Sequence, residues 1–286
     1  MSAKTIVITG TASGFGHLSV RLFSEAGWNV VATVRKKTDL DAHAGVENVE
    51  TLLLDVDDEE ADLAFGELAR SRFGRVDALI NNAGSFQSGP LEATTMDQVH
   101  RQFQTNVFGL IALSKAFIPV FRAQRSGVIV NVSSISAEAG FPYTSVYEAS
   151  KAAVAALTEG LHAELAEFGV VVKALFPGNM NTRIFSKVDR ARNTPEDYLA
   201  SWDAFASLNA VRSDPAITAE VMFRMVTDAD TKKVRYYSGP DGEAIPRVKQ
   251  LLGQDWYWEE FSARNRGAST PLWDALMPHP KATADQ

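Results

Sequence analysis

The segment Thr9-Gly10-Thr11-Ala12-Ser13-Gly14-Phe15-Gly16 decides how the first part of the chain folds. It closes the β-branched run Thr5–Thr9 and opens Gly14–Ala26, in which apolar residues recur at helical spacing. Glycines at such a strand-to-helix turn permit a tight bend and let backbone N–H groups and the helix N-terminus approach a pyrophosphate. The spacing, G-x-x-x-G-x-G, is one residue longer in its first gap than the common dinucleotide fingerprint. A glycine-rich turn without a ligand is the alternative.

The same alternation of strand and helix continues along the chain. Further β-branched runs are Asn29–Val34, Val49–Leu54, Val76–Asn81, Gly127–Val132 and Val170–Phe176, and a seventh strand is predicted at Val234–Ser238. Further helical patterns cover Glu59–Phe73, Met96–Ala123 and Tyr147–Phe168. Apolar strands separated by helices indicate βαβ units. We therefore predict an α/β fold, a single-domain doubly wound (Rossmann-type) parallel sheet of about seven strands with helices on both faces.

We expect residues 1–286 to form one domain with two additions. The segment near 183–215 loses the strict alternation and indicates an insertion that carries its own helix. A C-terminal extension begins at about Gly239 and is rich in aromatic residues, including Trp256-Tyr257-Trp258 and Phe261. The sequence leaves open whether this extension packs against the domain or forms a tail. It also leaves open whether the aromatic residues cover a pocket, block one or form an interface.

Composition excludes several classes of function. The chain has 286 residues, 45% of them hydrophobic, and a formal net charge of −7, which argues against a nucleic-acid surface and against anionic membranes. Without cysteine there are no disulfides, thiolate metal sites or thiol catalysis. The five histidines show no metal-ligand spacing, so we expect no metal. The apolar run Ile6–Ile8 is too short for a signal peptide. We expect a soluble, cytoplasmic protein.

Tyr147 and Lys151 form the strongest candidate for catalysis. Four residues apart, their side chains share one face of a helix. A free phenol has a pKa of about 10 and is a poor base, and a cation beside it favours the phenolate. The hydroxyl of Ser134, thirteen residues before Tyr147, is placed to hold a substrate oxygen. Tyr143 lacks a lysine four residues on, so we expect it to line the pocket instead.

Taken together, these motifs resemble the short-chain dehydrogenase/reductase family. The resemblance rests on the glycine loop, Asn81-Asn82-Ala83-Gly84, Asn106, Ser134, Tyr147, Lys151 and Pro177-Gly178, in the family's order from about residue 4 to residue 182. It implies a catalytic tetrad of Asn106, Ser134, Tyr147 and Lys151.

The resemblance implies a role for each member of the tetrad. Tyr147 would exchange a proton with the substrate oxygen, and Ser134 would hold and polarise this oxygen. Lys151 would lower the pKa of Tyr147 and hydrogen-bond the nicotinamide ribose, and Asn106 would anchor a water that links Lys151 to solvent. Ser133 competes with Ser134, but neighbouring strand residues face opposite sides and the family's spacing favours Ser134.

The resemblance also implies where a nicotinamide dinucleotide binds. The predicted cofactor residues are Gly10, Ser13, Gly14, Phe15, Gly16, Arg35, Asp55, Val56, Asn82, Ala83, Gly84, Tyr147, Lys151, Pro177, Gly178, Met180 and Thr182. An acidic residue at the end of the second strand would bind the adenosine ribose hydroxyls and repel a 2′-phosphate. This chain has Arg35-Lys36-Lys37 there, and a guanidinium fork suits a phosphate. We therefore expect NADP(H), as in NADP-preferring hydroxysteroid dehydrogenases and carbonyl reductases. The alternative is a solvated basic loop.

The predicted substrate pocket combines the loop Ile135–Thr144 with the insertion. Its expected lining is Ser136, Phe141, Tyr143, Ile184 and Phe185. This lining favours a hydrophobic ketone or alcohol, unless the residues are core beneath the loop. We predict an NADP(H)-dependent oxidoreductase that transfers a hydride between nicotinamide and a small-molecule carbonyl or secondary alcohol. The alternatives are a non-catalytic nucleotide-binding regulator, or an imine reductase or epimerase that uses the same tetrad. By resemblance, long helices pair between subunits, so we expect a homodimer or homotetramer.

Overall fold

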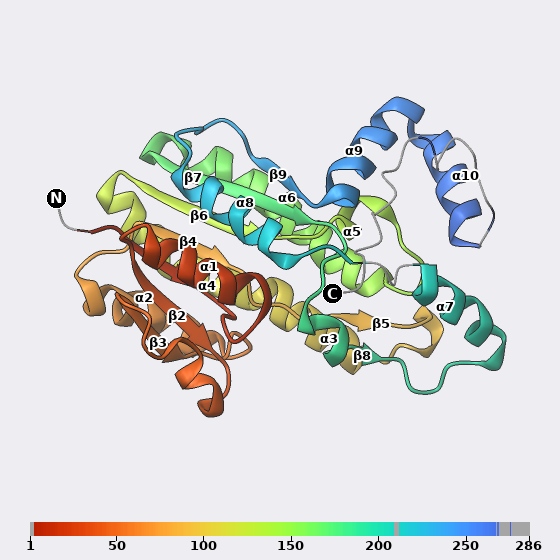
Figure 1. Cartoon of the computed structure of the whole chain (residues 1–286), viewed down its shortest axis with the longest axis horizontal. Coiled ribbons are helices and arrows are strands. Elements are labelled where there is room, and N and C mark those ends of the chain that lie inside the picture. The colour runs from red at the N-terminus through yellow and green to blue at the C-terminus, as the bar shows by residue number, and fades with distance from the viewer. Residues whose placement is uncertain (1–2, 209–211, 267, 269–274, 276–286) are drawn as a thin grey trace.

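The computed structural model describes residues 3–208, 212–266, 268 and 275, and a parallel sheet of seven strands forms its centre (Figure 1). The strands are β1 Thr5–Ile8, β2 Asn29–Val34, β3 Val49–Leu53, β4 Ala78–Asn81, β6 Gly127–Val132, β7 Val170–Pro177 and β9 Arg235–Ser238. Their order across the sheet is β3-β2-β1-β4-β6-β7-β9, and every neighbouring pair is parallel. The predicted doubly wound fold is confirmed.

Helices cover both faces of this sheet. The described helices are α1 Gly14–Glu25, α2 Glu59–Phe73, α3 Met96–Phe103, α4 Gly109–Gln124, α5 Ser136–Ala139, α6 Ser145–Leu165, α7 Glu196–Leu208, α8 Pro215–Thr227, α9 Pro240–Leu252 and α10 Gln254–Asn265. One apolar cluster joins the sheet to α1 and α8, and a second joins the other face to α2, α4 and α6. Figure 1 shows α1 and α8 in front of the sheet.

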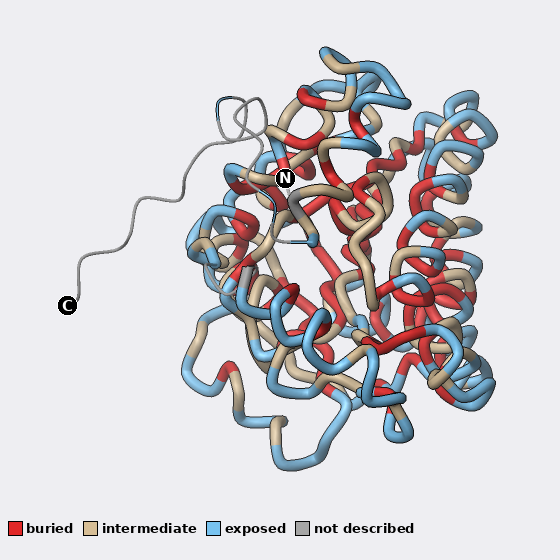
Figure 2. Tube along the Cα trace, turned by 90° about the vertical axis from the view of Figure 1, so that its right-hand side faces the viewer, coloured by how far each residue is buried: buried red, intermediate tan, exposed pale blue. Residues whose placement is uncertain are grey.

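Side-chain alternation explains why the strands are apolar throughout. Ile6 and Ile8 of β1 pack in the cluster with α1 and α8, whereas Val7 packs in the cluster on the other face. All three are fully buried, because a central parallel strand has no solvent face. Figure 2 shows this buried centre and the exposed outer sides of the helices.

The predicted helix Met96–Ala123 is interrupted in the structure. A π-helical turn, Gln104–Phe108, separates α3 from α4. By length and composition the run Met96–Gln124 is the one described helix that could cross a membrane, with a mean hydropathy of 1.3. Half of its apolar window is buried inside the molecule, and α4 packs against α2, as expected of a core helix.

The insertion and the C-terminal extension lie beside each other at the right-hand end of Figure 1. The insertion contains the predicted helix, α7, and a short strand, β8 Asp189–Arg190, which pairs with β5 Gln87–Ser88. The sequence did not predict this pairing. The extension forms α9 and α10, which pack on α5. Residues 209–211 of the predicted insertion and most of the extension after residue 268 lie outside the described residues.

Candidate active site

A cavity of about 580 Å³ lies at the carboxyl ends of the strands, where a doubly wound sheet binds its ligands. Most of the predicted cofactor and substrate residues line it. These are Gly10, Ser13, Gly14, Phe15, Arg35, Asp55, Val56, Asn82, Ala83, Gly84, Ser134, Ser136, Phe141, Tyr147, Lys151, Pro177, Gly178, Met180, Thr182, Ile184 and Phe185. The predicted residues Gly16, Asn106 and Tyr143 are absent from this lining.

The glycine loop between β1 and α1 is held tightly against β4. Gly10 has a φ of +69°, and a Cβ there would lie 2.9 Å from the Cα of Ala83, so only glycine fits. Asn82 fixes the loop by donating from Nδ2 to the carbonyl of Thr9, at 2.8 Å. The hydroxyl of Thr9 in turn accepts hydrogen bonds from the backbone N–H groups of Asn82 and Ala83, both at 2.9 Å.

The N-terminus of α1 faces the cavity without a cap. The side chain of Ser13, at the N-cap position, makes no capping hydrogen bond, and the first turn of α1 carries no acidic residue. Free N–H groups and the positive end of the helix dipole are therefore left for an anion. This feature fits the pyrophosphate of a dinucleotide.

Gly16 serves the loop differently from the prediction. We expected it among the cofactor residues, but it is buried within α1 and outside the cavity lining. A Cβ at this position would lie 2.6 Å from Nδ2 of Asn82. Gly16 therefore lets α1 pack close to the Asn82 side chain that holds the glycine loop.

Basic residues follow β2 at one end of the cavity. Arg35 and Lys36 line it and are exposed, and Asp39 lies in the same lining. Among the described residues Arg35 has no ion-pair partner. Asp55, after β3, lines the cavity and accepts a hydrogen bond from the backbone of Asp57, at 3.2 Å.

Ser134 and Tyr147 meet at the cavity, and Ser133 points elsewhere. Ser133 donates from its hydroxyl to the backbone carbonyl of Lys151 at 2.7 Å, which directs it toward α6. The side chain of Ser134 hydrogen-bonds that of Tyr147 and also accepts the backbone N–H of Ser136 at 3.1 Å. The structure therefore selects Ser134 over its neighbour as the serine beside the phenol.

Burial, rather than the neighbouring lysine, controls the pKa of Tyr147. Burial raises this pKa to about 12, while the hydrogen bond with Ser134 acts in the opposite direction. We expected Lys151 to lower the pKa, and that expectation is wrong for this structure. The Lys151 amine lies 5.9 Å from the centre of the Tyr147 ring and donates instead to the carbonyl of Val132, at 2.9 Å. Burial lowers the pKa of Lys151 to about 8.

Asn106 lies in the π-helical turn, buried behind the cavity. Its Oδ1 accepts the backbone N–H of Ser85 at 2.8 Å, and its Nδ2 donates to the hydroxyl of Ser150 at 3.0 Å. The Ser150 hydroxyl donates to the carbonyl of Tyr147, at 2.6 Å. Asn106 thus connects the loop after Gly84 to the helix that carries Tyr147. Its predicted role as a water anchor stays a prediction. π-Turns inside helices are frequent at functional sites.

Tyr143 does not line the cavity, which corrects the prediction. Its backbone has a φ of +64°, which is uncommon for a residue other than glycine, and its ring packs against α7. The phenol hydroxyl lies 2.5 Å from the hydroxyl of Ser201, and the ring stacks on Trp202 with centroids 6.0 Å apart.

Sequence reasoning missed Phe86 and several residues of the insertion. Phe86 lines the cavity, and its ring meets that of Tyr147 edge to face, with centroids 4.7 Å apart. Its position two residues after Gly84 was the available signal. The other missed lining residues on the substrate side include Arg183, Lys187, Arg190, Trp202, Phe205 and Arg212.

Comparison with known proteins agrees with the fold described above. A family model described as short chain dehydrogenase matches residues 4–193. The chain belongs to this family. A short-chain dehydrogenase from Streptomyces avermitilis superposes with a TM-score of 0.79 at 32% identity, covering 91% of this chain and 97% of its own.

Two further relatives extend the comparison. The uncharacterized oxidoreductase YusZ of Bacillus subtilis is 33% identical over 86% of this chain and 91% of its own. The 3-ketoacyl-(acyl-carrier-protein) reductase from Brucella melitensis, whose structure is a complex with NADH, superposes with a TM-score of 0.71 at 26% identity, covering 83% of this chain and 98% of its own. This protein is thus an oxidoreductase of the short-chain dehydrogenase family.

Proposed function

We propose that this protein is an NADP(H)-dependent oxidoreductase that interconverts a small hydrophobic ketone and its secondary alcohol. The observation that carries the proposal is the arrangement of Ser134, Tyr147 and Lys151 along one wall of the cavity. The glycine loop and the uncapped N-terminus of α1 border the same cavity. The relative bound to NADH supports a nicotinamide dinucleotide as the cofactor.

The residues around the glycine loop fit this cofactor. The uncapped N-terminus of α1 would hold the pyrophosphate, and Gly10, Ser13 and Gly14 of the loop before it line the cavity. Arg35, which has no ion-pair partner among the described residues, would hold the adenosine 2′-phosphate, with Ser13 and Lys36 beside it. The cofactor, when bound, supplies or accepts the hydride.

Tyr147 would donate the proton during reduction. With a pKa raised to about 12, the phenol is protonated at neutral pH, so it is ready to act as the acid in the reductive direction. Ser134, hydrogen-bonded to the phenol, would hold the substrate oxygen as negative charge develops on it. Lys151, with a pKa lowered to about 8, would replace the proton that Tyr147 loses.

Reduction of a panel of hydrophobic aryl ketones, followed by the loss of NADPH absorbance, tests the proposal. In Tyr147→Phe the ring keeps its place but has no proton to give, so the rate should fall by about 100-fold or more. NADPH binding, measured by fluorescence, should stay within about threefold of wild type. A Tyr147→Phe variant that keeps most of its activity, or a wild type inert toward every ketone, contradicts the proposal.

A further inference from the structure

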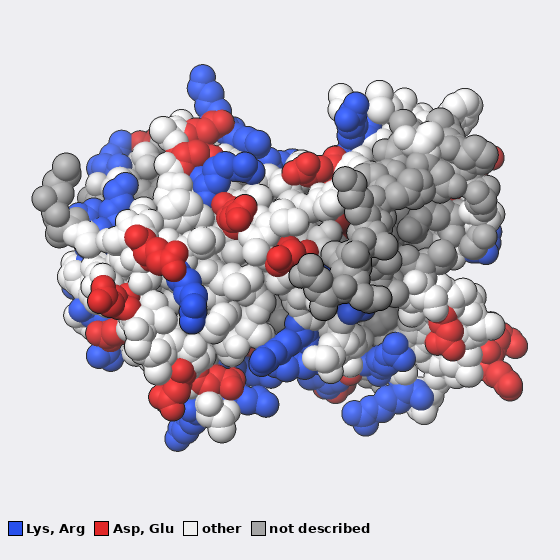
Figure 3. Space-filling model, viewed as in Figure 1, with Lys and Arg blue, Asp and Glu red and all other residues white. Residues whose placement is uncertain are grey.

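Four basic residues line the substrate side of the cavity. Arg183, Lys187, Arg190 and Arg212 all come from the insertion that follows β7. In a protein of net charge −7 such a concentration is unexpected. Basic side chains gather in the lower middle of the face drawn in Figure 3.

None of these four cations forms an ion pair within the described part of the chain. The acidic residues of the lining are Asp39, Asp55 and Asp241. Asp39 follows β2 and Asp55 follows β3, near the basic end proposed for the adenosine phosphate. The Asp241 carboxylate accepts the backbone N–H of Asn179 at 2.7 Å. Among the described residues, no acidic side chain of the lining therefore forms an ion pair with Arg183, Lys187, Arg190 or Arg212.

An aromatic wall connects Arg212 to the candidate catalytic tyrosine. The guanidinium carbon of Arg212 lies 3.9 Å from the centre of the Phe185 ring. Phe185 meets Phe86 edge to face, with centroids 5.7 Å apart, and Phe86 meets Tyr147 at 4.7 Å. An apolar molecule lying on these rings would have one end at Tyr147 and the other at a guanidinium.

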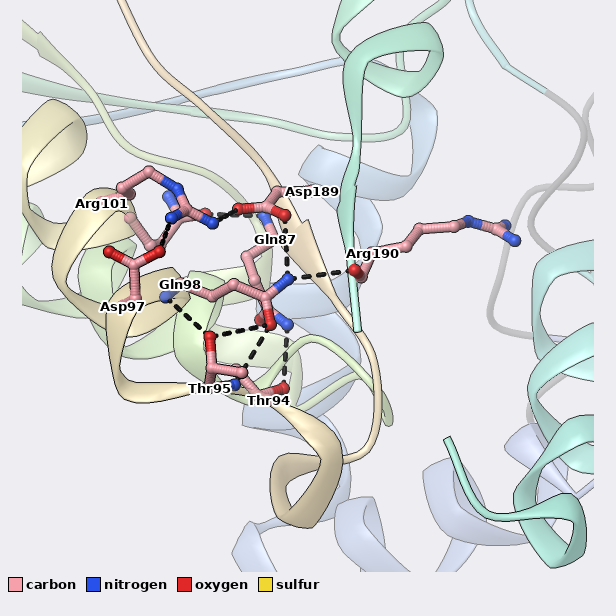
Figure 4. Close-up of polar contacts among 9 residues, drawn as sticks. Gln87, Thr94, Thr95, Asp97, Gln98, Arg101, Asp189 and Arg190 are labelled. Carbon is pink, nitrogen blue, oxygen red and sulfur yellow. Dashed lines mark hydrogen bonds and ion pairs between the residues drawn. The ribbon is translucent and has the colours of Figure 1, made fainter. Parts of the chain in front are cut away.

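Arg190 reaches the same cavity from a fixed backbone. Gln98 of α3 donates from Nε2 to the Asp189 carboxylate at 2.8 Å and to the carbonyl of Arg190 at 3.0 Å, and Arg101 pairs with Asp189 at 2.7 Å (Figure 4). The Arg190 side chain extends away from this network in Figure 4, and its guanidinium lies 5.1 Å from the Trp202 ring centre. Anchoring β8 in this way reduces the entropy lost when Arg190 binds a ligand.

We propose that the substrate is an apolar or aromatic ketone that carries an oxyanion, such as a carboxylate, at the end remote from its carbonyl. This inference rests on the carbonyl chemistry proposed above. Arg190 and Arg212 bind the oxyanion, because a guanidinium presents two parallel N–H groups that match its geometry. The rings of Phe86, Phe185 and Trp202 hold the body of the molecule. Partial burial lowers the pKa of Arg212.

A matched pair of ketones tests this charge requirement. The probes are 4′-acetylbiphenyl-4-carboxylate and the neutral 4′-acetylbiphenyl-4-carboxamide, titrated by calorimetry into protein saturated with NADP⁺ so that Arg35 is occupied. The carboxylate should bind about tenfold or more tightly than the amide. In Arg190→Gln and Arg212→Gln the ratio of carboxylate affinity to amide affinity should fall toward one. Arg183 is left intact because it adjoins Thr182 of the proposed cofactor cradle.

Arg192→Gln is the control, since Arg192 belongs to the same segment but is absent from the cavity lining. It should keep the wild-type preference. Equal binding of the two probes, an unchanged preference in both cavity variants, or displacement of the carboxylate by further NADP⁺ would overturn the inference. Measuring turnover of the two probes separates the oxyanion site from the proposed function. If both probes are reduced equally, the proposed function stands and the oxyanion site is contradicted. If the carboxylate binds selectively but neither probe is reduced, the oxyanion site stands and the proposed function is contradicted.

Discussion

The phenol of Tyr147 and the amine of Lys151 lie on one face of α6, and each has a different hydrogen-bond partner. Ser134 holds the phenol, and the carbonyl of Val132 holds the amine. Of the two groups, Lys151 has the pKa nearer neutrality, about 8 against about 12. The lysine is therefore the group that titrates in the range where enzymes are assayed.

This difference predicts how reduction depends on pH. As pH rises through about 8, Lys151 loses its proton and can no longer replace the one that Tyr147 gives up, so the rate of reduction should fall. The measurement is kcat for ketone reduction at saturating NADPH between pH 6 and pH 10. In Lys151→Gln the residual rate should show no decrease near pH 8. A wild-type rate that stays constant through this range would contradict the role given to Lys151.

Asp62 of α2 predicts a pH effect on stability rather than on catalysis. It is fully buried, and neither carboxylate oxygen has a hydrogen-bond partner among the described residues. Burial, with the nearby Asp58, Asp55 and Asp57 adding to it, raises its pKa from 3.8 to about 7. The folded protein thus binds more protons than the unfolded chain between these two values.

The free energy of unfolding contributed by Asp62 is therefore highest below about pH 4 and falls as pH rises to about 7. Asp62→Asn removes this dependence, so the variant should be more stable than wild type above pH 7. Urea unfolding at pH 5 and pH 8 measures the difference. Glu25→Gln, at an exposed carboxylate, should show no such change. If Asp62→Asn is less stable than wild type at pH 8, the Asp62 carboxylate has favourable partners in the folded protein and the prediction is wrong.

At the scale of single residues, most candidates chosen from motif spacing line the cavity. Motif spacing failed for residues whose orientation or contacts depend on the local backbone or on a residue of another element. The Tyr143 ring packs against Trp202 of α7 instead of lining the cavity, and the contact of Gly16 with Asn82 is made across elements. The pKa of Tyr147 was misjudged because burial depends on the whole fold.

At the scale of elements, α10 secures the loop that follows Ser134. Tyr257 is fully buried against Ile135 and Ala139, and its hydroxyl donates to the carbonyl of Ala139 at 3.1 Å. A Cβ on Gly140 would lie 2.3 Å from the Trp258 ring, which shows how closely the loop and helix approach.

Tyr257→Ala should therefore lower the free energy of unfolding by about 3–5 kcal/mol, the usual cost of deleting a buried aromatic ring. Trp256→Ala is the matched control, because Trp256 is 63% exposed and its loss should cost less than about 0.5 kcal/mol. Urea unfolding at pH 7 compares the two. Equal effects of both substitutions would mean that α10 does not pack as the structure shows.

The strands of the central sheet could be predicted because burial on both faces makes each one continuously apolar. The pairing of β5 with β8 could not, since each strand has only two residues and β8 is held by a hydrogen bond from Gln98 of the distant α3 to Asp189. For a similar reason, the sequence did not show whether the C-terminal extension packs against the domain. Tyr257 and Phe261 are buried one turn apart, and the rest of α10 shows little periodicity.

At the scale of the whole molecule, two separate groups of basic residues line the cavity. Arg35 and Lys36 of the first group follow β2, and the second group consists of the cations of the insertion. Tyr147 and Ser134 lie in the same cavity. This arrangement supports a phosphorylated dinucleotide at the first group and the substrate at the second. The expected homodimer or homotetramer stays a prediction.

The most direct test of this account is a fluorescence titration of the purified protein with NADPH and with NADH, repeated on Arg35→Ala. Losing a charge-assisted contact costs about 1.5–3 kcal/mol, so NADPH should bind wild type about tenfold or more tightly than NADH. Arg35→Ala should remove this preference by weakening NADPH alone, and Arg72→Ala, on the far end of α2, should not. Equal affinity for the two dinucleotides in wild type, or a preference that survives in Arg35→Ala, would contradict the account.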